Sequence, residues 1–284
     1  MSVETGPVQV TAEVLGVKQA GAYHHLTLAA PGVAERFRPG SFVSVAVGGP
    51  LSAAVLRRAL PVYRARPTSG HGGTVESVFE VTDPVTAWLA GLPASTPVDV
   101  IGPLGRPFAL PKEAVPCVLV ADGCASAPLF ALAERLRDRG CVVHMLLGAT
   151  SEARLFGALD ARRAARGVTV ATQDGSVGIP GGVVEALPDL LRRTAADVVY
   201  AAGPDDVLHG VALVAEAHGA WSQTAVDVPA GCGTGLCLSC VLPVVGEDGV
   251  TRMVRSCTDG PVFRGDRVRW GDIGTVPTDA RGAS

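Results

Sequence analysis

Hydrophobic and polar residues alternate along this chain with two different periods. Up to about residue 110, short apolar and β-branched runs are separated by Gly, Pro and Ser, which is typical of antiparallel strands in a barrel or sandwich. One predicted helix, residues 84–91, interrupts them, with Asp83 as its N-cap and Pro84 in the first helical position. The predicted strands are residues 8–14, 23–28, 42–47, 56–63, 75–81 and 98–101.

From residue 116 onward, strand and helix patterns alternate. An apolar run at 117–121 precedes a predicted helix at 126–140, in which Leu129, Leu132, Ala133 and Leu136 share one stripe. Further strands are predicted at 141–147, 168–172 and 197–202, and further helices at 152–166, 182–193 and 205–218. This alternation predicts a parallel sheet covered by helices on both faces. Such sheets bind ligands beyond the carboxyl ends of their strands, so we expect a nucleotide crevice there.

The last part of the chain contains four closely spaced cysteines. Cys232, Cys237 and Cys240 form a C-x4-C-x2-C array, and Cys257 follows after sixteen intervening residues. Between Cys240 and Cys257, apolar runs at 241–245 and 250–254 flank a Gly-Glu-Asp-Gly turn. We interpret this segment as a β-hairpin that returns Cys257 beside Cys240. The first spacing is that of plant-type [2Fe-2S] clusters, which four thiolates hold.

Other uses of these cysteines are less consistent with the pattern. A structural zinc site usually has two C-x2-C pairs, whereas this array has one such pair and one wider gap. Unligated buried thiols are an alternative, but four of the seven cysteines fall within 26 residues. Disulfides fit poorly because we recognise no secretory signal and expect a cytoplasmic protein.

Length and charge limit the remaining classes. A chain of 284 residues is long enough for several small domains, which we place at 1–112, 113–222 and 223–284. The formal net charge of -3 gives no reason to expect a nucleic-acid partner. No run of eighteen residues lacks both charges and turn-forming residues, so we expect no membrane span.

The order of these parts resembles the electron-transfer subunit of heteromeric dihydroorotate dehydrogenases, a ferredoxin-reductase-like flavoprotein family. Besides the cysteine array, the resemblance rests on C-T-D-G-P-V-F at 257–263, G-P-L-G at 102–105, and D-G-S at 174–176 followed by Gly178. It implies an N-terminal antiparallel FAD-binding barrel, a central doubly wound parallel-sheet lobe of the NAD(P)-binding type, and a small C-terminal [2Fe-2S] domain. It also implies an oxidoreductase component of pyrimidine biosynthesis. In that family electrons pass from NADH through FAD and the cluster to an FMN-containing catalytic subunit of the heteromer.

The resemblance also implies site residues. Arg58 matches the arginine that pairs with the FAD pyrophosphate, which suits a guanidinium fork. Pro61 stands where the family has a serine, and residues 83–86 replace a Gly-x-Gly-Thr turn that faces the FAD phosphates. The implied flavin-binding residues are Arg58, Ala59, Leu60, Pro61, Val85 and Thr86, and the implied cluster ligands are Cys232, Cys237, Cys240 and Cys257.

The nicotinamide loop departs further from the family. Its glycine-rich sequence is replaced by A-D-G-C-A at 121–125. Asp122 would place a negative charge near a pyrophosphate, which weighs against NAD(P)H as the donor. Two alternatives therefore stay open: a flavin and iron-sulfur reductase serving another redox partner in specialised metabolism, and a non-catalytic iron-sulfur subunit with relic flavin and NAD pockets.

Overall fold

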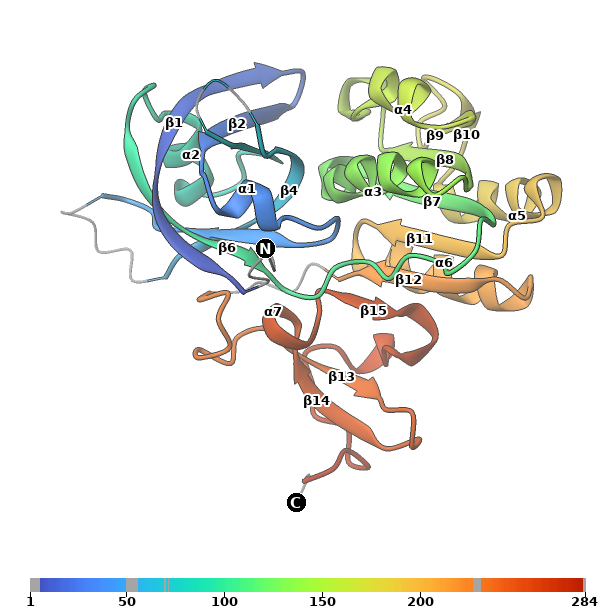
Figure 1. Ribbon diagram of the computed structural model, residues 1–284. Helices are drawn as coiled ribbons and strands as arrows, with labels where there is room; N and C mark the ends of the chain where they lie inside the picture. The colour runs from blue at the N-terminus through green and yellow to red at the C-terminus, as the bar shows by residue number, and fades with distance from the viewer. Residues whose placement is uncertain (1–5, 50–55, 69, 71, 227–230, 283–284) are drawn as a thin grey trace.

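The computed structural model describes residues 6–49, 56–68, 70, 72–226 and 231–282. Figure 1 shows a barrel beside a helix-covered sheet, with a hairpin below the two. Among the described residues, no helix is both long and apolar enough to cross a membrane.

The barrel is closed and antiparallel, in the strand order β1-β2-β5-β4-β3-β6. Its core consists of apolar side chains such as Leu26, Val43, Val62 and Val100. All six predicted strands are present. The four-residue helix α1 was not predicted, because it is too short to show a period. The elements are β1 Val8–Ala20, β2 Tyr23–Ala29, α1 Val33–Arg36, β3 Phe42–Val45, β4 Arg58–Arg66, β5 Thr74–Phe79, α2 Pro84–Ala90 and β6 Pro97–Leu104.

The second lobe is a doubly wound sheet in the order β10-β9-β8-β7-β11-β12-β15, parallel except at β15. Helices α3 and α4 contribute to the core on one face, and α5 and α6 to the core on the other, as predicted. The elements are β7 Pro116–Asp122, η1 Gly123–Ser126, α3 Ala127–Asp138, β8 Val142–Ala149, η2 Glu152–Arg154, α4 Ala158–Ala164, β9 Gly167–Thr172, β10 Ile179–Pro180, α5 Val183–Thr194, β11 Val198–Ala202, α6 Asp205–Ala217, β12 Trp221–Ala225 and β15 Val262–Arg264.

The single helix predicted at 152–166 is wrong. The chain instead forms the short turn η2, extends, and only then begins α4. Gly157 interrupts the pattern with φ 70°, and a Cβ there would collide with the ring of Phe130. The preceding Phe156 packs against Tyr63 of the barrel and Phe130 of α3, so tertiary packing overrides the local helical pattern.

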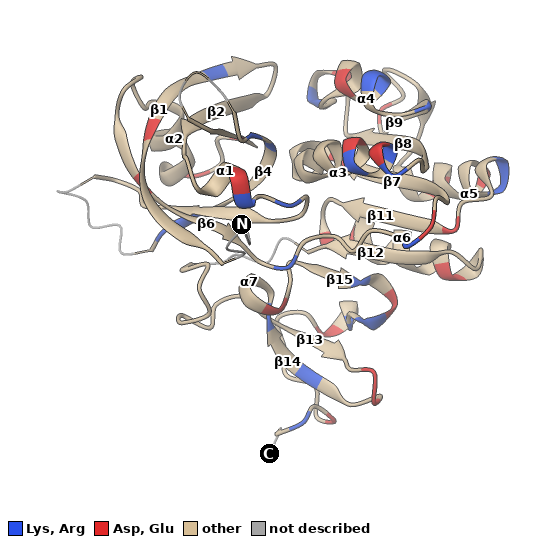
Figure 2. Ribbon diagram, viewed as in Figure 1, with Lys and Arg blue, Asp and Glu red and all other residues tan. Residues whose placement is uncertain are grey.

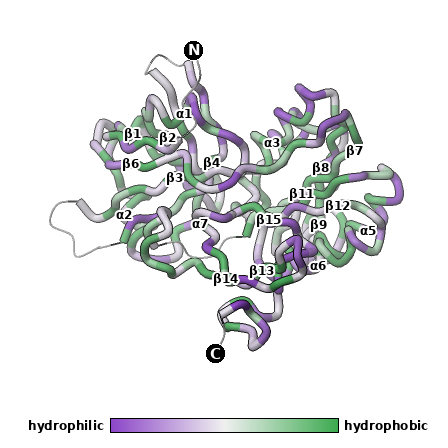
Figure 3. The backbone as a smooth tube through the Cα atoms, turned by 60° about the horizontal axis from the view of Figure 1, so that its bottom comes forward, coloured by the Kyte–Doolittle hydropathy of each residue, from purple (hydrophilic) through white to green (hydrophobic). Residues whose placement is uncertain are grey.

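The cysteine segment is joined to the second lobe. Strands β13 Val241–Val245 and β14 Thr251–Arg255 form the predicted hairpin, and the short helix α7 Ser256–Asp259 follows. After α7, β15 pairs with β12 and so extends the lobe's sheet. Two 3-10 turns, η3 Gly265–Arg267 and η4 Trp270–Asp272, lead to the tail, which Figure 3 shows projecting near β14. Neither β12 nor β15 was predicted.

Aromatic side chains of the barrel pack against aromatic side chains of the second lobe. The Tyr63 ring centroid lies 5.4 Å from that of Phe130 and 5.6 Å from that of Phe156. The Tyr63 hydroxyl donates to Asp160 Oδ2 at 2.6 Å, and the Tyr23 hydroxyl donates to the Arg154 carbonyl at 2.6 Å. These contacts join the barrel to the lobe.

Candidate functional site

The loop at 231–240 is folded around the sulfur of Cys232. Backbone N–H groups of Thr234, Leu236 and Cys237 donate to Cys232 Sγ at 3.3, 3.3 and 3.4 Å. Burial acts to raise the pKa of Cys232, but the N–H groups of Cys237 and Thr234 outweigh it and lower the pKa to about 6. The loop thus favours a thiolate at Cys232, the form that binds metal.

The hairpin places Cys257 beside Cys240, as predicted. The Ser256 N–H donates to the Cys240 carbonyl at 2.8 Å, and both thiols are buried in one small cluster with Phe42 and Leu104. Burial, and then the neighbouring Cys240 thiol, raise the pKa of Cys257 to about 12. These two thiols form one close pair.

The four cysteines are arranged as two pairs. Cys237 donates its N–H to Cys232 Sγ, and the Cys237 side chain also helps lower the Cys232 pKa. Within the described part of the chain, which includes all four, no three His, Cys, Asp or Glu side chains are placed to hold one metal ion. Zinc needs four donors around one ion, whereas a [2Fe-2S] cluster takes two ligands on each iron. The two pairs match the two ligands that each iron of a [2Fe-2S] cluster takes.

The cysteine loop, residues 231–240, lies against the barrel and contains no acidic or basic side chain. The Ser44 hydroxyl, from β3, donates to the Cys232 carbonyl at 3.1 Å. Gly233 has φ 74°, and a Cβ there would lie 3.1 Å from Ser44 Cβ and 3.2 Å from a ring carbon of Phe42. Residues 231–240 include no Asp, Glu, Lys or Arg, so this loop is tan in Figure 2.

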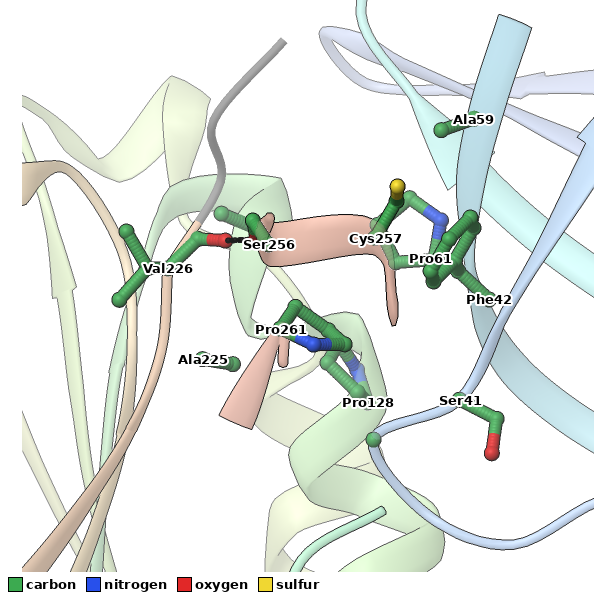
Figure 4. A pocket seen from close by; sticks show the side chains of 12 residues that line it. Ser41, Phe42, Ala59, Pro61, Pro128, Ala225, Val226, Ser256, Cys257 and Pro261 are labelled. Atoms are coloured by element: carbon green, nitrogen blue, oxygen red, sulfur yellow. Dashed lines mark hydrogen bonds between the residues drawn. The ribbon is translucent and has the colours of Figure 1, made fainter. Parts of the chain in front are cut away.

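An apolar pocket lies where barrel, lobe and cysteine segment meet (Figure 4). Ala59 and Pro61 of β4 form one wall, Pro128 of α3 belongs to another, and Cys257 of α7 lines the same space. Leu60, between the two β4 residues, is buried in the barrel core, because side chains alternate along a strand. In the predicted flavin segment, the side chains of Ala59 and Pro61 therefore line the pocket, whereas the side chain of Leu60 lies in the barrel core.

Further lining residues were not identified from the sequence. Ser41, Phe42, Ser256 and Pro261 come from separate stretches, and none was predicted to line a ligand site. The available signals were the position of Ser256 beside Cys257 and the place of Pro261 in the C-T-D-G-P-V-F motif.

Arg58, Val85 and Thr86 do not line this pocket. Arg58 Nη2 lies 2.5 Å from Asp83 Oδ2, while Asp83 Oδ1 accepts the Thr86 N–H at 2.8 Å. Val85 packs against the barrel core. Although burial opposes it, hydrogen bonding from Thr86 and the charge of Arg58 lower the pKa of Asp83. The predicted cap by Asp83 is confirmed, and the same carboxylate engages both Arg58 and Thr86.

A second, more polar crevice adjoins the apolar pocket. It opens at the carboxyl ends of β7, β8 and β11, where ligand binding was expected, and Ala125 lines both cavities. Glu80 and Asp122 line it, and Arg154, also in its wall, lies 2.5 Å from Glu80. Burial, and then nearby Asp206, raise the pKa of Asp122. A phosphate entering here would meet carboxylates and an arginine already paired.

Comparisons with known proteins agree with this geometry. Residues 230–269 match the family model of the iron-sulfur cluster binding domain of dihydroorotate dehydrogenase B. The chain is 34% identical to the dihydroorotate dehydrogenase B (NAD(+)) electron transfer subunit of Geobacillus thermodenitrificans, covering 86% of this chain and 92% of the relative. It is 32% identical to the probable counterpart of Methanopyrus kandleri, covering 87% of each.

Solved structures share the architecture. A structure of the NADH-dependent reduced ferredoxin-NADP oxidoreductase aligns with a TM-score of 0.79 at 26% identity, covering 92% of this chain and 91% of that one. A cytochrome P450 reductase from Amycolatopsis aligns with a TM-score of 0.58 at 20% identity, covering 75% of this chain and 66% of that one, which concerns the fold alone.

Proposed function

This chain belongs to the family of electron-transfer subunits of dihydroorotate dehydrogenase B, and from that premise we propose how its residues perform the relay. The chain passes electrons from a reduced donor through FAD and a [2Fe-2S] cluster to a catalytic partner. One observation supports this most directly: Ala59 and Pro61 of the flavin segment line the same pocket as Cys257. A flavin in that pocket would lie against a cluster ligand.

We assign the cluster to Cys232, Cys237, Cys240 and Cys257. In this assignment each of the two pairs described above would hold one iron. The N–H groups around Cys232 stabilise its thiolate form, and hydrogen bonds to sulfur help set the potential of such clusters. Cys237 is exposed while Cys257 is buried beside the pocket, so the ligand set extends from the pocket to the surface.

We assign the flavin ring to the apolar pocket. Ala59 and Pro61 would pack against it, and Pro61, which lacks an N–H, would contribute contact alone. Bound FAD supplies the ability to accept two electrons together and to release them singly to a one-electron carrier. The residues present fit the ring well. The residues expected to bind the FAD phosphates fit less well, because Arg58 is already paired with Asp83.

The donor site of this proposal is the polar crevice. Ala125 lines both cavities, so a nicotinamide group in the crevice would be next to the flavin pocket. The curated relatives are named for NAD(+). In this chain the Asp122 carboxylate would weaken dinucleotide binding, and we expect a lower affinity for NADH than a glycine-rich loop would allow.

For the partner, we propose an FMN-containing catalytic subunit of the dihydroorotate dehydrogenase type. The relatives are named as electron-transfer subunits, and the cysteine loop offers a suitable surface. The loop contains no Asp, Glu, Lys or Arg, and Leu236 and Leu238 on either side of Cys237 are 84% and 61% exposed. Apolar side chains around an exposed ligand suit a contact with a second protein.

A second candidate is a relay that serves a different redox partner. The structural relative at 26% identity is an NADH-dependent reduced ferredoxin-NADP oxidoreductase, so this architecture also occurs with another activity. Both candidates require FAD and the cluster, and they differ only in the final acceptor.

The test has two stages. Anaerobically purified protein should contain two irons, two sulfides and one FAD per chain, measured against protein concentration. Mixed with its catalytic subunit, it should couple NADH oxidation to orotate reduction and, in the reverse direction, dihydroorotate oxidation to orotate with reduction of NAD(+). Iron and sulfide without flavin, under FAD saturation, would exclude the flavin relay. A full cofactor complement without orotate formation would favour the second candidate.

A further inference from the structure

Asp83 makes contacts that a phosphate group would need. Its Oδ2 atom accepts from Arg58 Nη2 at 2.5 Å, and its Oδ1 atom accepts from the Thr86 N–H at 2.8 Å. The Thr86 hydroxyl in turn accepts the Asp83 N–H at 3.1 Å. Both carboxylate oxygens are therefore engaged, one by the guanidinium and one by the backbone.

The neighbouring arginine offers no substitute for Arg58. Arg57 Nη2 lies 2.5 Å from Asp99 Oδ1 and donates to the backbone carbonyls of Asp99 at 2.8 Å and Ser44 at 3.0 Å. Arg57, the residue before β4, is thus held by β3 and β6. Arg58 makes its only ion pair among the described residues with Asp83, and its side chain is 35% exposed. It is thus accessible to a ligand but already neutralised.

We propose that Asp83 is an internal competitor for the diphosphate of the flavin dinucleotide and sets the affinity of this chain for FAD. This inference rests on the proposed flavin function. To pair with Arg58, the diphosphate must displace the carboxylate and approach a like charge. Asp83 does not line the apolar pocket to which the flavin ring is assigned. The competition therefore acts on the phosphates and leaves ring binding unaffected.

The variant that tests this is Asp83→Asn. Asparagine still caps a helix, because its side-chain oxygen accepts the same N–H, but it removes the negative charge. We expect Asp83→Asn to bind FAD at least tenfold more tightly, which corresponds to about 1.4 kcal/mol. Riboflavin, which has the ring and no phosphate, should bind equally to both proteins. Affinities would be measured by flavin fluorescence quenching or calorimetry on the full chain.

Two further variants separate the effect from general changes in the barrel. Asp99→Asn removes the carboxylate paired with Arg57 and should leave the FAD affinity unchanged. Adding Arg58→Gln to Asp83→Asn should abolish the gain, because the freed guanidinium is its cause. Thermal unfolding of each variant confirms that the proteins compared are folded.

The outcomes distinguish this inference from the function on which it rests. Equal FAD affinities of the wild type and Asp83→Asn, with both binding FAD, would overturn the competition but keep the flavin relay. A gain that riboflavin shares, or that persists with Arg58→Gln, would also overturn it. If no variant binds FAD or riboflavin, both the competition and the proposed flavin function fail. Binding of FAD by Asp83→Asn and not by the wild type would support the competition strongly.

Discussion

Gly233 should be one of the most sensitive positions of the cysteine loop, and Gly233→Ala tests whether that loop must rest on the barrel. At φ 74°, an alanine meets a backbone penalty of about 1 to 2 kcal/mol. Its Cβ would also lie 3.1 Å from Ser44 Cβ and 3.2 Å from Phe42. Overpacking of this kind typically costs about 1 to 3 kcal/mol. The total of roughly 2 to 5 kcal/mol exceeds what a short loop is expected to absorb without moving.

Displacement of the loop from β3 would remove the contact between Ser44 and Cys232 and disturb the N–H groups around the Cys232 sulfur. We expect Gly233→Ala to retain less than half of the iron and sulfide of the wild type, with a matching loss of visible absorbance. Gly249→Ala is the matched control, because Gly249 has φ 76° with no atom within 4 Å of its added Cβ. It carries the backbone penalty without the crowding. Equal cluster content in Gly233→Ala and the wild type would refute the argument.

Three further predictions follow from the site and its supports. Cys237→Ser should lose the cluster absorbance while the barrel stays folded, and an unchanged visible spectrum would show that this thiol is not a ligand. Tyr63→Phe removes the hydrogen bond to Asp160 at 2.6 Å and should lower the free energy of unfolding by about 1 to 2 kcal/mol in denaturant titrations. Burial acts to raise the pKa of Asp160, but hydrogen bonds from Tyr63 and Arg64 outweigh it and lower the pKa. The stabilisation by the Asp160 carboxylate is therefore present above its unfolded pKa of about 3.9 and is lost as the pH falls below that value. Asp122→Asn should lower the KM for NADH at least tenfold, because it removes a negative charge that repels the phosphates of the dinucleotide. Burial and Asp206 raise the pKa of Asp122, so this charge grows as the pH rises and the gain should be larger at higher pH. A KM that does not change would place the dinucleotide elsewhere.

Local features of this protein followed from its sequence. The cap by Asp83 depends on residues three apart, and the return of Cys257 to Cys240 depends on one hairpin. The alternation from residue 116 onward predicted the doubly wound sheet, because each strand and helix shows its own period. In the cap and the hairpin the deciding contacts lie within one element or between consecutive ones, whereas the sheet was predicted from the period of each element alone. The assignment of ligands and flavin residues came from the resemblance and stays a prediction.

Other features depended on partners distant in sequence. The break at Gly157 exists because Phe130 fills the space beside it, and β12 is a strand because it pairs with β11 and β15. From the sequence, Arg58 was expected to be available to a phosphate, but the structure pairs it with Asp83, 25 residues away.

The sequence by itself determined the antiparallel barrel, the doubly wound parallel sheet and the hairpin of the cysteine segment. It also determined the cysteine array and the residues that could carry charge. The tertiary structure alone decided that Ala59 and Cys257 share a pocket and that the pocket adjoins the polar crevice through Ala125. The physical reason is that periodicity records which face of an element is buried, whereas the partner on that face is selected only when barrel, lobe and hairpin pack together.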